Sequence, residues 1–216
     1  IVDNFSTGAR SNIEILKLPY HEFDAADTIQ LKELLCSKPF DVILHFAGSA
    51  YVDESFEQPA KYYENNVLTG FSLLETVREL EPLPKIIFSS SCATYGIPSK
   101  CPIVEDSPQI PISPYGRSKL IVEWMLLDYY VKYKQPYTIL RYFNAAGCHP
   151  NGTLGELHDP ETHLIPRMIL AALKKSYSSA LLNNSEISGP NFPTVSRQAT
   201  ALLNALKPFL RRQPTQ

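Results

Sequence analysis

The stretch DVILHFAG, residues 41–48, is a short and continuous run of apolar side chains that ends in a glycine. Two further runs have the same character, KIIFSSS at 85–91 and YTILRYFN at 137–144. Strands covered on both faces show this continuous pattern, whereas strands with one wet face alternate apolar and polar residues. The three runs predict buried parallel strands, and the weaker run IEILKL at 13–18 is a candidate for a fourth.

Helical stretches separate these runs, at residues 27–36, 58–80, 116–133 and 163–174. Strands that alternate with helices indicate parallel β-α-β units. We therefore expect an α/β fold built on a doubly wound, Rossmann-like parallel sheet.

The composition excludes several classes of protein. The 216 residues are 44% hydrophobic with a net charge of −2, which permits a large core and leaves no basic footprint for nucleic acid. No apolar run approaches the roughly 18 residues that span a bilayer, and no leader precedes the first strand. We expect a soluble, cytoplasmic protein without nucleic-acid or membrane partners.

Metal binding is poorly supported. The four cysteines form no C-x-x-C pair, and His45, His149, His158 and His163 lack helical i, i+4 pairing or a cysteine partner. We expect no metal site.

The two ends of the chain differ from its middle. Ile1-Val2-Asp3-Asn4 resembles the end of a strand, and no glycine-rich phosphate loop occurs in the sequence. In dinucleotide-binding folds an acidic residue at this place binds the adenosine ribose, and the loop lies ~20 residues before it. Asp3 is either that acid or an ordinary turn residue. Residues 174–216 hold six Lys or Arg and one Glu, without strand patterning. They predict a divergent, mobile tail.

The segment SPYGRSK, residues 113–119, is the sharpest chemical signal. It places Tyr115 and Lys119 four residues apart, on one helix face. A lysine ammonium near a phenol favours the phenolate, which makes Tyr115 a candidate acid/base. The spacing alone is weak because Tyr130 and Lys134 share it, at a polar helix end that predicts a solvated face.

A serine triplet, Ser89 to Ser91, ends the second apolar run shortly before this segment. Side chains at the carboxyl end of a parallel strand face the ligand crevice of such a sheet. The serines predict either ligand contacts or simple capping of the strand end.

Together these residues resemble the Ser-Tyr-Lys set of the extended short-chain dehydrogenases/reductases, and within them the UDP-glucose 4-epimerase family. The following blocks are similar to that family and occur in the same order: HFAGSAYVDES (45–55), YYENNV (62–67), FSSSCATYGIP (88–98), PIVEDSPQIPISPYGRSK (102–119), RYFNAAG (141–147) and DPETHLIP (159–166). The resemblance covers residues 1–173, which it implies are a partial NAD-binding domain that lacks the first strand and the glycine loop.

The resemblance implies NAD as cofactor, a UDP-sugar as substrate and a homodimeric intact enzyme. Its implied catalytic residues are Tyr115, Lys119 and Ser91. Its implied cofactor residues are Asp3, Asn4, Asp24, Ala25, Phe46, Ala47, Gly48, Asn66, Ser89, Tyr115, Lys119 and Tyr142. Its implied substrate residues are Ser91, Tyr115, Phe143, Asn144, His163 and Leu164.

Several alternatives stay open at this point. A related nucleotide-sugar enzyme is one, such as a UDP-arabinose 4-epimerase, a 4,6-dehydratase or a decarboxylase. A dehydratase should carry an Asp-Glu pair after the central serine, whereas Cys92-Ala93 follow Ser91 here. A non-catalytic remnant is another, and we expect the 216 residues alone to be inactive because the phosphate loop and the family's later UDP-gripping segment are missing from them.

Overall fold

The structure, a computed structural model, describes residues 1–150, 152–153, 155, 161 and 163–173. The chain divides into two compact units, Ile1–Phe143 and Asn144–Gln216, and each is described by itself. The predicted tail at 174–216 lies outside the described residues.

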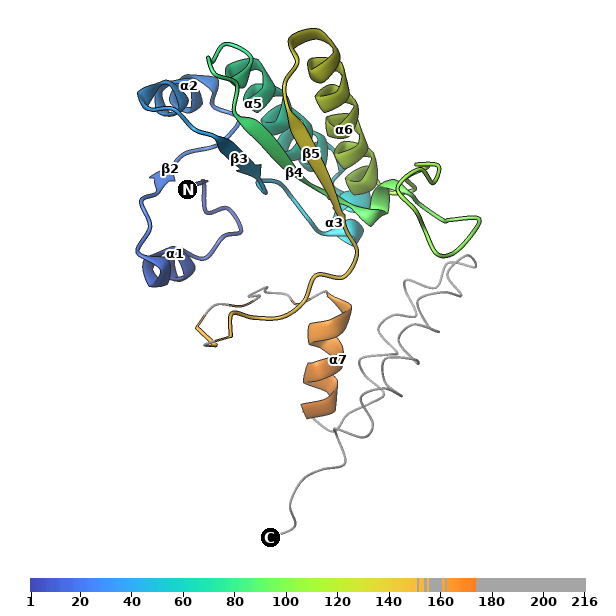
Figure 1. Cartoon of the computed structure of the whole chain (residues 1–216). Helices are drawn as coiled ribbons and strands as arrows, with labels where there is room; N and C mark the ends of the chain where they lie inside the picture. The colour runs from blue at the N-terminus through green and yellow to red at the C-terminus, as the bar shows by residue number, and fades with distance from the viewer. Residues whose placement is uncertain (151, 154, 156–160, 162, 174–216) are drawn as a thin grey trace. The chain divides into compact units, whose positions relative to one another are not determined.

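The first unit is an α/β structure whose strands are parallel, as the sequence predicts (Figure 1). Its strands are β1 (Val2–Asp3), β2 (His21–Glu22), β3 (Val42–His45), β4 (Lys85–Ser91) and β5 (Tyr137–Tyr142). Its helices are α1 (Arg10–Leu16), α2 (Thr28–Ser37), α3 (Val52–Glu57), α4 (Pro59–Tyr62), the π-turn η1 (Tyr63–Leu68), α5 (Thr69–Val77), the 3-10 turn η2 (Cys92–Thr94) and α6 (Pro114–Tyr133). In the second unit, α7 spans Leu164–Leu173.

The strands form two groups. Strand β1 pairs with β2, and β3, β4 and β5 form a sheet in that order. In the larger sheet Ile86 of β4 lies between Ile43 of β3 and Tyr137 of β5. All these strands therefore present their carboxyl ends in the same direction within each sheet, which is where ligands bind in such folds.

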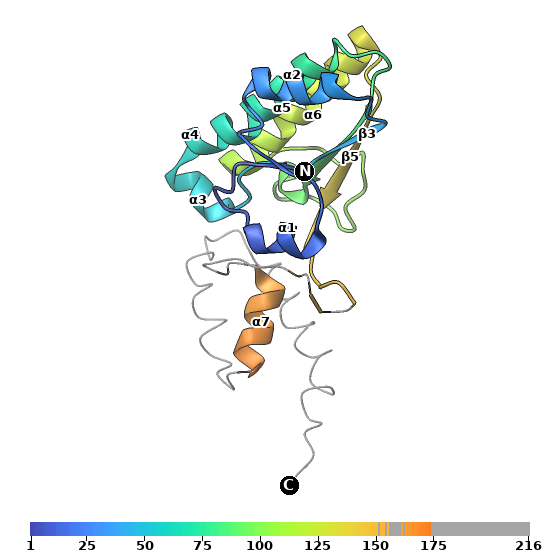
Figure 2. The same cartoon turned by 90° about the vertical axis from the view of Figure 1, so that its left-hand side faces the viewer.

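Helices α2, α5 and α6 lie along one face of the three-stranded sheet (Figures 1 and 2). The core forms between this helical layer and the sheet. Its buried members are Phe23, Leu31, Leu35, Leu73, Leu74, Val77, Ile86, Phe88, Val122 and Leu126. Each such side chain contributes roughly 1.5–3 kcal/mol when fully buried, so this layer fixes the sheet on which the site is built.

The predicted strand at 13–18 is wrong, because this stretch forms helix α1. Ile13 is buried, while Ile15 and Leu16 are exposed, so the segment does not use an alternating pattern. Lys17 ends the helix in the left-handed region at φ 52°, and its amide donates to the carbonyls of Ile13 and Glu14. A left-handed residue at this place is a usual helix stop.

No helix in the described residues is long and apolar enough to cross a membrane.

Candidate functional site

Helix α6 begins at the predicted segment and carries Tyr115 and Lys119 in its first turns. The Ser113 side chain accepts a hydrogen bond from the amide of Gly116 at 3.0 Å, and Pro114 takes the first helical position. Both features favour a helix start at this residue. Tyr115 and Lys119 are buried, whereas Tyr130 of the competing pair is 48% exposed. The sequence context thus separates the two Tyr-Lys pairs correctly.

Tyr115 lies close to Ser91 at the end of β4. Burial raises the pKa of the Tyr115 phenol, and the polar Ser91 side chain offsets part of that rise. The sequence reasoning expected the lysine to lower this pKa; in the structure burial dominates because the phenol is almost wholly enclosed. Ser91 also caps η2 by accepting from the amide of Ala93 at 3.1 Å. The capping and ligand interpretations of this serine are therefore compatible.

The Lys119 ammonium lies at the centre of the site. It donates to the carbonyl oxygen of Ser89 at 3.0 Å and lies 5.2 Å from the Phe88 ring centre and 5.9 Å from the Tyr115 ring centre. Burial lowers the pKa of Lys119 to about 8, so its charge changes close to neutral pH. This combination of burial and shifted ionisation is typical of functional sites.

The turn after β3 brings the backbone close to Lys119. Gly48 has φ 143°, and a Cβ there would lie 2.5 Å from Asn66 Oδ1 and 3.7 Å from Lys119 Nζ. Asn66 accepts from the Ser49 amide at 2.7 Å and donates to the Ser49 carbonyl at 3.1 Å and to Ser118 at 2.9 Å. Asn65 donates to the Ser49 hydroxyl at 2.9 Å. The π-turn η1 thus joins this turn to α6, and only glycine fits at position 48.

A second polar group lies at the carboxyl ends of β1 and β2. Asp3 accepts from the amide of Phe5 at 2.7 Å, and a Cβ on Gly8 would lie 2.9 Å from its carboxylate. Asn4 donates to Asp24 at 3.2 Å, and Asp24 accepts from the amide of Ala26 at 2.8 Å. The structure therefore brings Asn4 and Asp24, 20 residues apart in sequence, into contact, and Asp3 lines the same cavity.

A cavity of about 640 Å³ lies between β1 and β3 in the first unit. Its wall has an apolar part and a polar rim. The predicted cofactor residues in the wall are Asp3, Asn4, Asp24, Ala25, Phe46, Ala47 and Gly48. The remaining ones, Asn66, Ser89, Tyr115, Lys119 and Tyr142, do not line it. Gly48 joins the two sets because it lines the cavity and approaches both Asn66 and Lys119.

Sequence reasoning missed other residues in this wall, namely Ser6, Ser49, Lys61, Asn65 and Thr69. Asn65 precedes a predicted residue in the NN pair of the 62–67 block, which was the available signal. Lys61 donates to Glu54 at 2.6 Å, and a lysine in a short loop-like helix carried no recognisable pattern.

The predicted substrate residues divide between the two units. Tyr142 pairs in register with Ser91, and the exposed Phe143 follows it at the end of β5. Asn144, His163 and Leu164 belong to the second unit, where the His163 ring and amide contact the Glu161 carboxylate and Leu164 begins α7.

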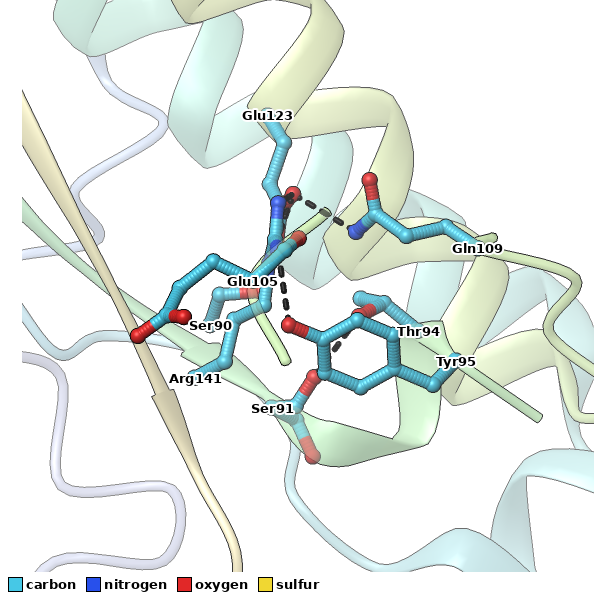
Figure 3. A network of polar contacts seen from close by, with 8 residues as sticks. All are labelled: Ser90, Ser91, Thr94, Tyr95, Glu105, Gln109, Glu123 and Arg141. Atoms are coloured by element: carbon cyan, nitrogen blue, oxygen red, sulfur yellow. Dashed lines mark hydrogen bonds and ion pairs between the residues drawn. The ribbon is translucent and has the colours of Figure 1, made fainter. Parts of the chain in front are cut away.

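A buried carboxylate, Glu123, was also missed. It is 4% exposed, lies one helical turn beyond Lys119 and forms an ion pair with Arg141 at 2.7 Å (Figure 3). Its position eight residues after Tyr115 places it on the same face of α6. That spacing was the available signal.

Comparisons with known proteins show to which family the chain is similar. The profile of the family described as GDP-mannose 4,6 dehydratase matches residues 2–187. A UDP-glucose 4-epimerase of Lactobacillus helveticus is 40% identical over 173 residues, which cover 80% of this chain and 52% of that protein. A probable UDP-arabinose 4-epimerase of Arabidopsis thaliana is 41% identical over 169 residues, covering 74% of this chain and 41% of that protein.

Solved structures show the same relationship. A UDP-glucose 4-epimerase of Brucella ovis in complex with NAD has a TM-score of 0.75 at 52% identity, over 81% of this chain and 53% of that one. One from Bifidobacterium longum in complex with NAD⁺ and UDP has a TM-score of 0.73 at 30% identity, over 83% and 56%. The chain spans about half the length of the relatives that it matches.

Proposed function

Because the chain belongs to the GDP-mannose 4,6 dehydratase family, we propose that it is the cofactor-binding and catalytic part of an NAD-dependent UDP-sugar 4-epimerase. The proposed reaction is the interconversion of UDP-galactose and UDP-glucose, and it is supported by several relatives and structural neighbours that carry the name UDP-glucose 4-epimerase. The site roles below are part of the same proposal, as are the homodimeric state of the intact enzyme and its cytoplasmic location.

One observation carries the proposal. Tyr115 and Lys119 start a helix beside the carboxyl end of β4, where Ser91 contacts the tyrosine and Ser89 accepts from the lysine. An acid/base with a hydroxyl partner and an adjacent cation is what proton removal from a sugar hydroxyl requires.

The residues present fit a dinucleotide. The cavity lies at the carboxyl ends of β1 and β3, where Gly8 approaches Asp3 and Gly48 approaches Asn66 too closely for a Cβ. We propose that Asp3 and Asn4 hold the adenosine ribose, that Asp24 and Ala25 flank the adenine, and that Phe46 to Gly48 line the middle of NAD. Asn66, Ser89, Lys119 and Tyr142 serve the nicotinamide end. An acid at Asp3 favours NAD over NADP because it repels a 2′-phosphate.

The chain's own residues manage the proton of the sugar. Tyr115 Oη removes the proton of the 4-hydroxyl and returns it after the sugar has turned, and Ser91 orients that hydroxyl and relays the proton. The Lys119 ammonium stabilises the phenolate form in which Tyr115 accepts that proton, because the site is buried and a charge acts strongly there. NAD, when bound, supplies the reversible oxidation at C4.

The sugar nucleotide needs further contacts. We propose that Phe143 and Asn144 contact the sugar or its phosphates, and that His163 and Leu164 contact the nucleotide. The Glu161 carboxylate lies 3.2 Å from the His163 ring nitrogen Nδ1 and is part of that arrangement.

A UDP-arabinose 4-epimerase is a second candidate, because relatives with that name are 40–41% identical to this chain. The chemistry at C4 is the same, so the two differ only in what surrounds the sugar. A dehydratase is disfavoured despite the family description, since Cys92-Ala93 follow Ser91.

The test uses a chimera, because the chain spans about half the length of its relatives. Residues 1–173 replace the matching segment of the Brucella ovis enzyme, and turnover of UDP-galactose and UDP-arabinose is measured with bound NAD. We expect epimerisation of one of them in the chimera and none in the 216-residue chain. A folded chimera that binds NAD and converts neither sugar would contradict the proposal.

A further inference from the structure

A buried polar network, which Figure 3 shows from close by, attaches helix α6 to the sheet. Glu123 of α6 accepts from the Ser90 hydroxyl of β4 and from Nε and Nη2 of Arg141 on β5, the latter at 2.7 Å. The carboxylate is 4% exposed, so these contacts lie in a poorly screened environment.

Each anchor of this network is next to a residue of the proposed site. Ser90 lies between Ser89, which binds Lys119, and Ser91, which contacts Tyr115. Glu123 lies on the helix face that carries Lys119 one turn earlier and Tyr115 two turns earlier. The contacts therefore hold α6 against β4 next to the place where Tyr115 and Lys119 meet the end of the strand.

The same network holds the loop that leads into α6. Arg141 Nη1 donates to the Tyr95 hydroxyl at 2.8 Å and to the Glu105 carbonyl at 3.0 Å, and Gln109 donates to Glu123 at 2.8 Å. The Arg141 guanidinium also lies 5.1 Å from the Tyr95 ring centre. Arg141 thus uses three nitrogens for three different chain segments, which a lysine at this place cannot do.

We propose that Glu123 and Arg141 are positioning residues that set the alignment of Tyr115 and Lys119 against Ser89 and Ser91. The inference rests on the proposed function for the roles of these four residues. The bidentate pair is rigid, and shortening or replacing either partner lets α6 move along β4.

The test reads the surroundings of Lys119 in the 216-residue chain, without cofactor or substrate. Lysine is labelled with ¹³C, the Lys119 signal is assigned by its loss in Lys119→Met, and its pKa is measured by titration. Glu123→Asp and Arg141→Lys keep both charges and change only the geometry. The groups that face Lys119, His45 of β3 and Tyr115 of α6, are unchanged in both.

Glu75 on α5 and Arg78, which directly follows α5, supply matched controls. They form a bidentate pair at 2.9 Å that also receives a tyrosine hydroxyl, from Tyr129, away from the proposed site. The control variants are Glu75→Asp and Arg78→Lys.

We expect Glu123→Asp and Arg141→Lys to raise the pKa of Lys119 by about one unit or more, because misalignment admits water to the ammonium. The controls should leave it unchanged. If either variant fails to fold, Ser90→Ala, which removes one contact to Glu123, should shift the pKa in the same direction by less. The proposal would be overturned if the folded variants had a lower melting temperature but an unchanged Lys119 pKa. The ion pair of Glu123 and Arg141 would then serve stability only. The measurement of the Lys119 pKa does not depend on enzyme activity. A lack of activity in the chimera would therefore count against the proposed function and not against this inference.

Discussion

Lys119 Nζ donates a hydrogen bond to the carbonyl oxygen of Ser89 at 3.0 Å, which joins the start of α6 to the end of β4. The ammonium has no room for a full hydration shell, since Lys119 is 5% exposed and packs near Phe88 and Tyr115. A buried cation held by a backbone carbonyl is a costly arrangement for stability alone. That cost has consequences that can be measured.

The first prediction concerns stability in alkaline solution. Burial lowers the pKa of Lys119 from 10.5 to about 8, so between these values the unfolded chain binds more protons than the folded one. Stability must then rise with pH through this window, at up to about 1.4 kcal/mol per pH unit. Relative to Lys119→Met, the wild-type chain should gain about 1–2 kcal/mol of unfolding free energy between pH 8 and pH 9.5, as measured by urea denaturation.

Comparison with the variant matters because Cys92, Tyr62 and Tyr129 have raised pKa values and act in the opposite direction. Their contributions cancel in the difference. Lys134→Met, at the exposed end of α6, is the control and should behave as wild type. Equal pH dependence in wild type and Lys119→Met would show that the lysine is not held in a dry site.

The second prediction concerns acid. His45 packs against Phe88, its Nε2 finds no hydrogen-bond partner among the described residues, and burial lowers its pKa to about 3. The unfolded chain binds the proton below about pH 6.5 and the folded chain does not, so stability is lost as pH falls. Between pH 7.5 and pH 5, His45→Leu should lose about 2 kcal/mol less unfolding free energy than the wild-type chain, as measured by chemical denaturation. The exposed His21→Leu should not. Identical acid profiles for wild type and His45→Leu would refute this.

The third prediction concerns turnover. In the chimera, Tyr115→Phe should lower kcat at least ~10²-fold, because the phenol that handles the proton is lost. Tyr130→Phe, in the exposed pair with the same spacing, should have little effect. Steady-state kinetics decide between them, and near-normal turnover of Tyr115→Phe would remove the tyrosine from its proposed role.

The fourth prediction concerns the choice of cofactor. In competition experiments the chimera should bind NAD more tightly than NADP. Asp3→Asn should reduce the ratio of the two affinities by about tenfold or more, because it removes a negative charge near the 2′-phosphate of NADP. Asp41→Asn, an exposed position before β3, is the control. Tighter binding of NADP to the unaltered protein would be incompatible with Asp3 as the ribose ligand.

Much of the fold could be predicted from local patterns. The apolar runs at 41–48, 85–91 and 137–144 form β3, β4 and β5, because a strand buried between neighbours needs no polar alternation. The start of α6 was predictable too. The Ser113 side chain accepts a hydrogen bond from a free amide of the first turn, and Pro114 has a backbone angle suited to the first helical position. The run at 13–18 was ambiguous, as short apolar stretches are, and its helix depends on a left-handed Lys17 that no propensity indicates.

The site was predictable in part. Asp3, Asn4 and Asp24 meet because the strand ends that carry them are paired in parallel. The contact between Glu123 and Arg141 was not predictable, because it depends on the register between a helix and a strand 18 residues apart. The periodicity of a sequence does not show which side chains of a helix and a strand meet. The only signal in the sequence was that Glu123 shares a helix face with Tyr115.

The π-turn η1 makes the structure depend on the number of residues in this part of the chain as well as on their identity. Its wider turn is what lets the neighbours Asn65 and Asn66 both reach Ser49. Dropping one residue would restore a regular helix, and one side of it would then rotate by about 100° relative to the other. Either the asparagines would turn away from the loop or Leu73, Leu74 and Val77 would turn away from the core. A deletion within η1 would therefore disturb either the contacts of Ser49 or the hydrophobic core, whichever residue is removed.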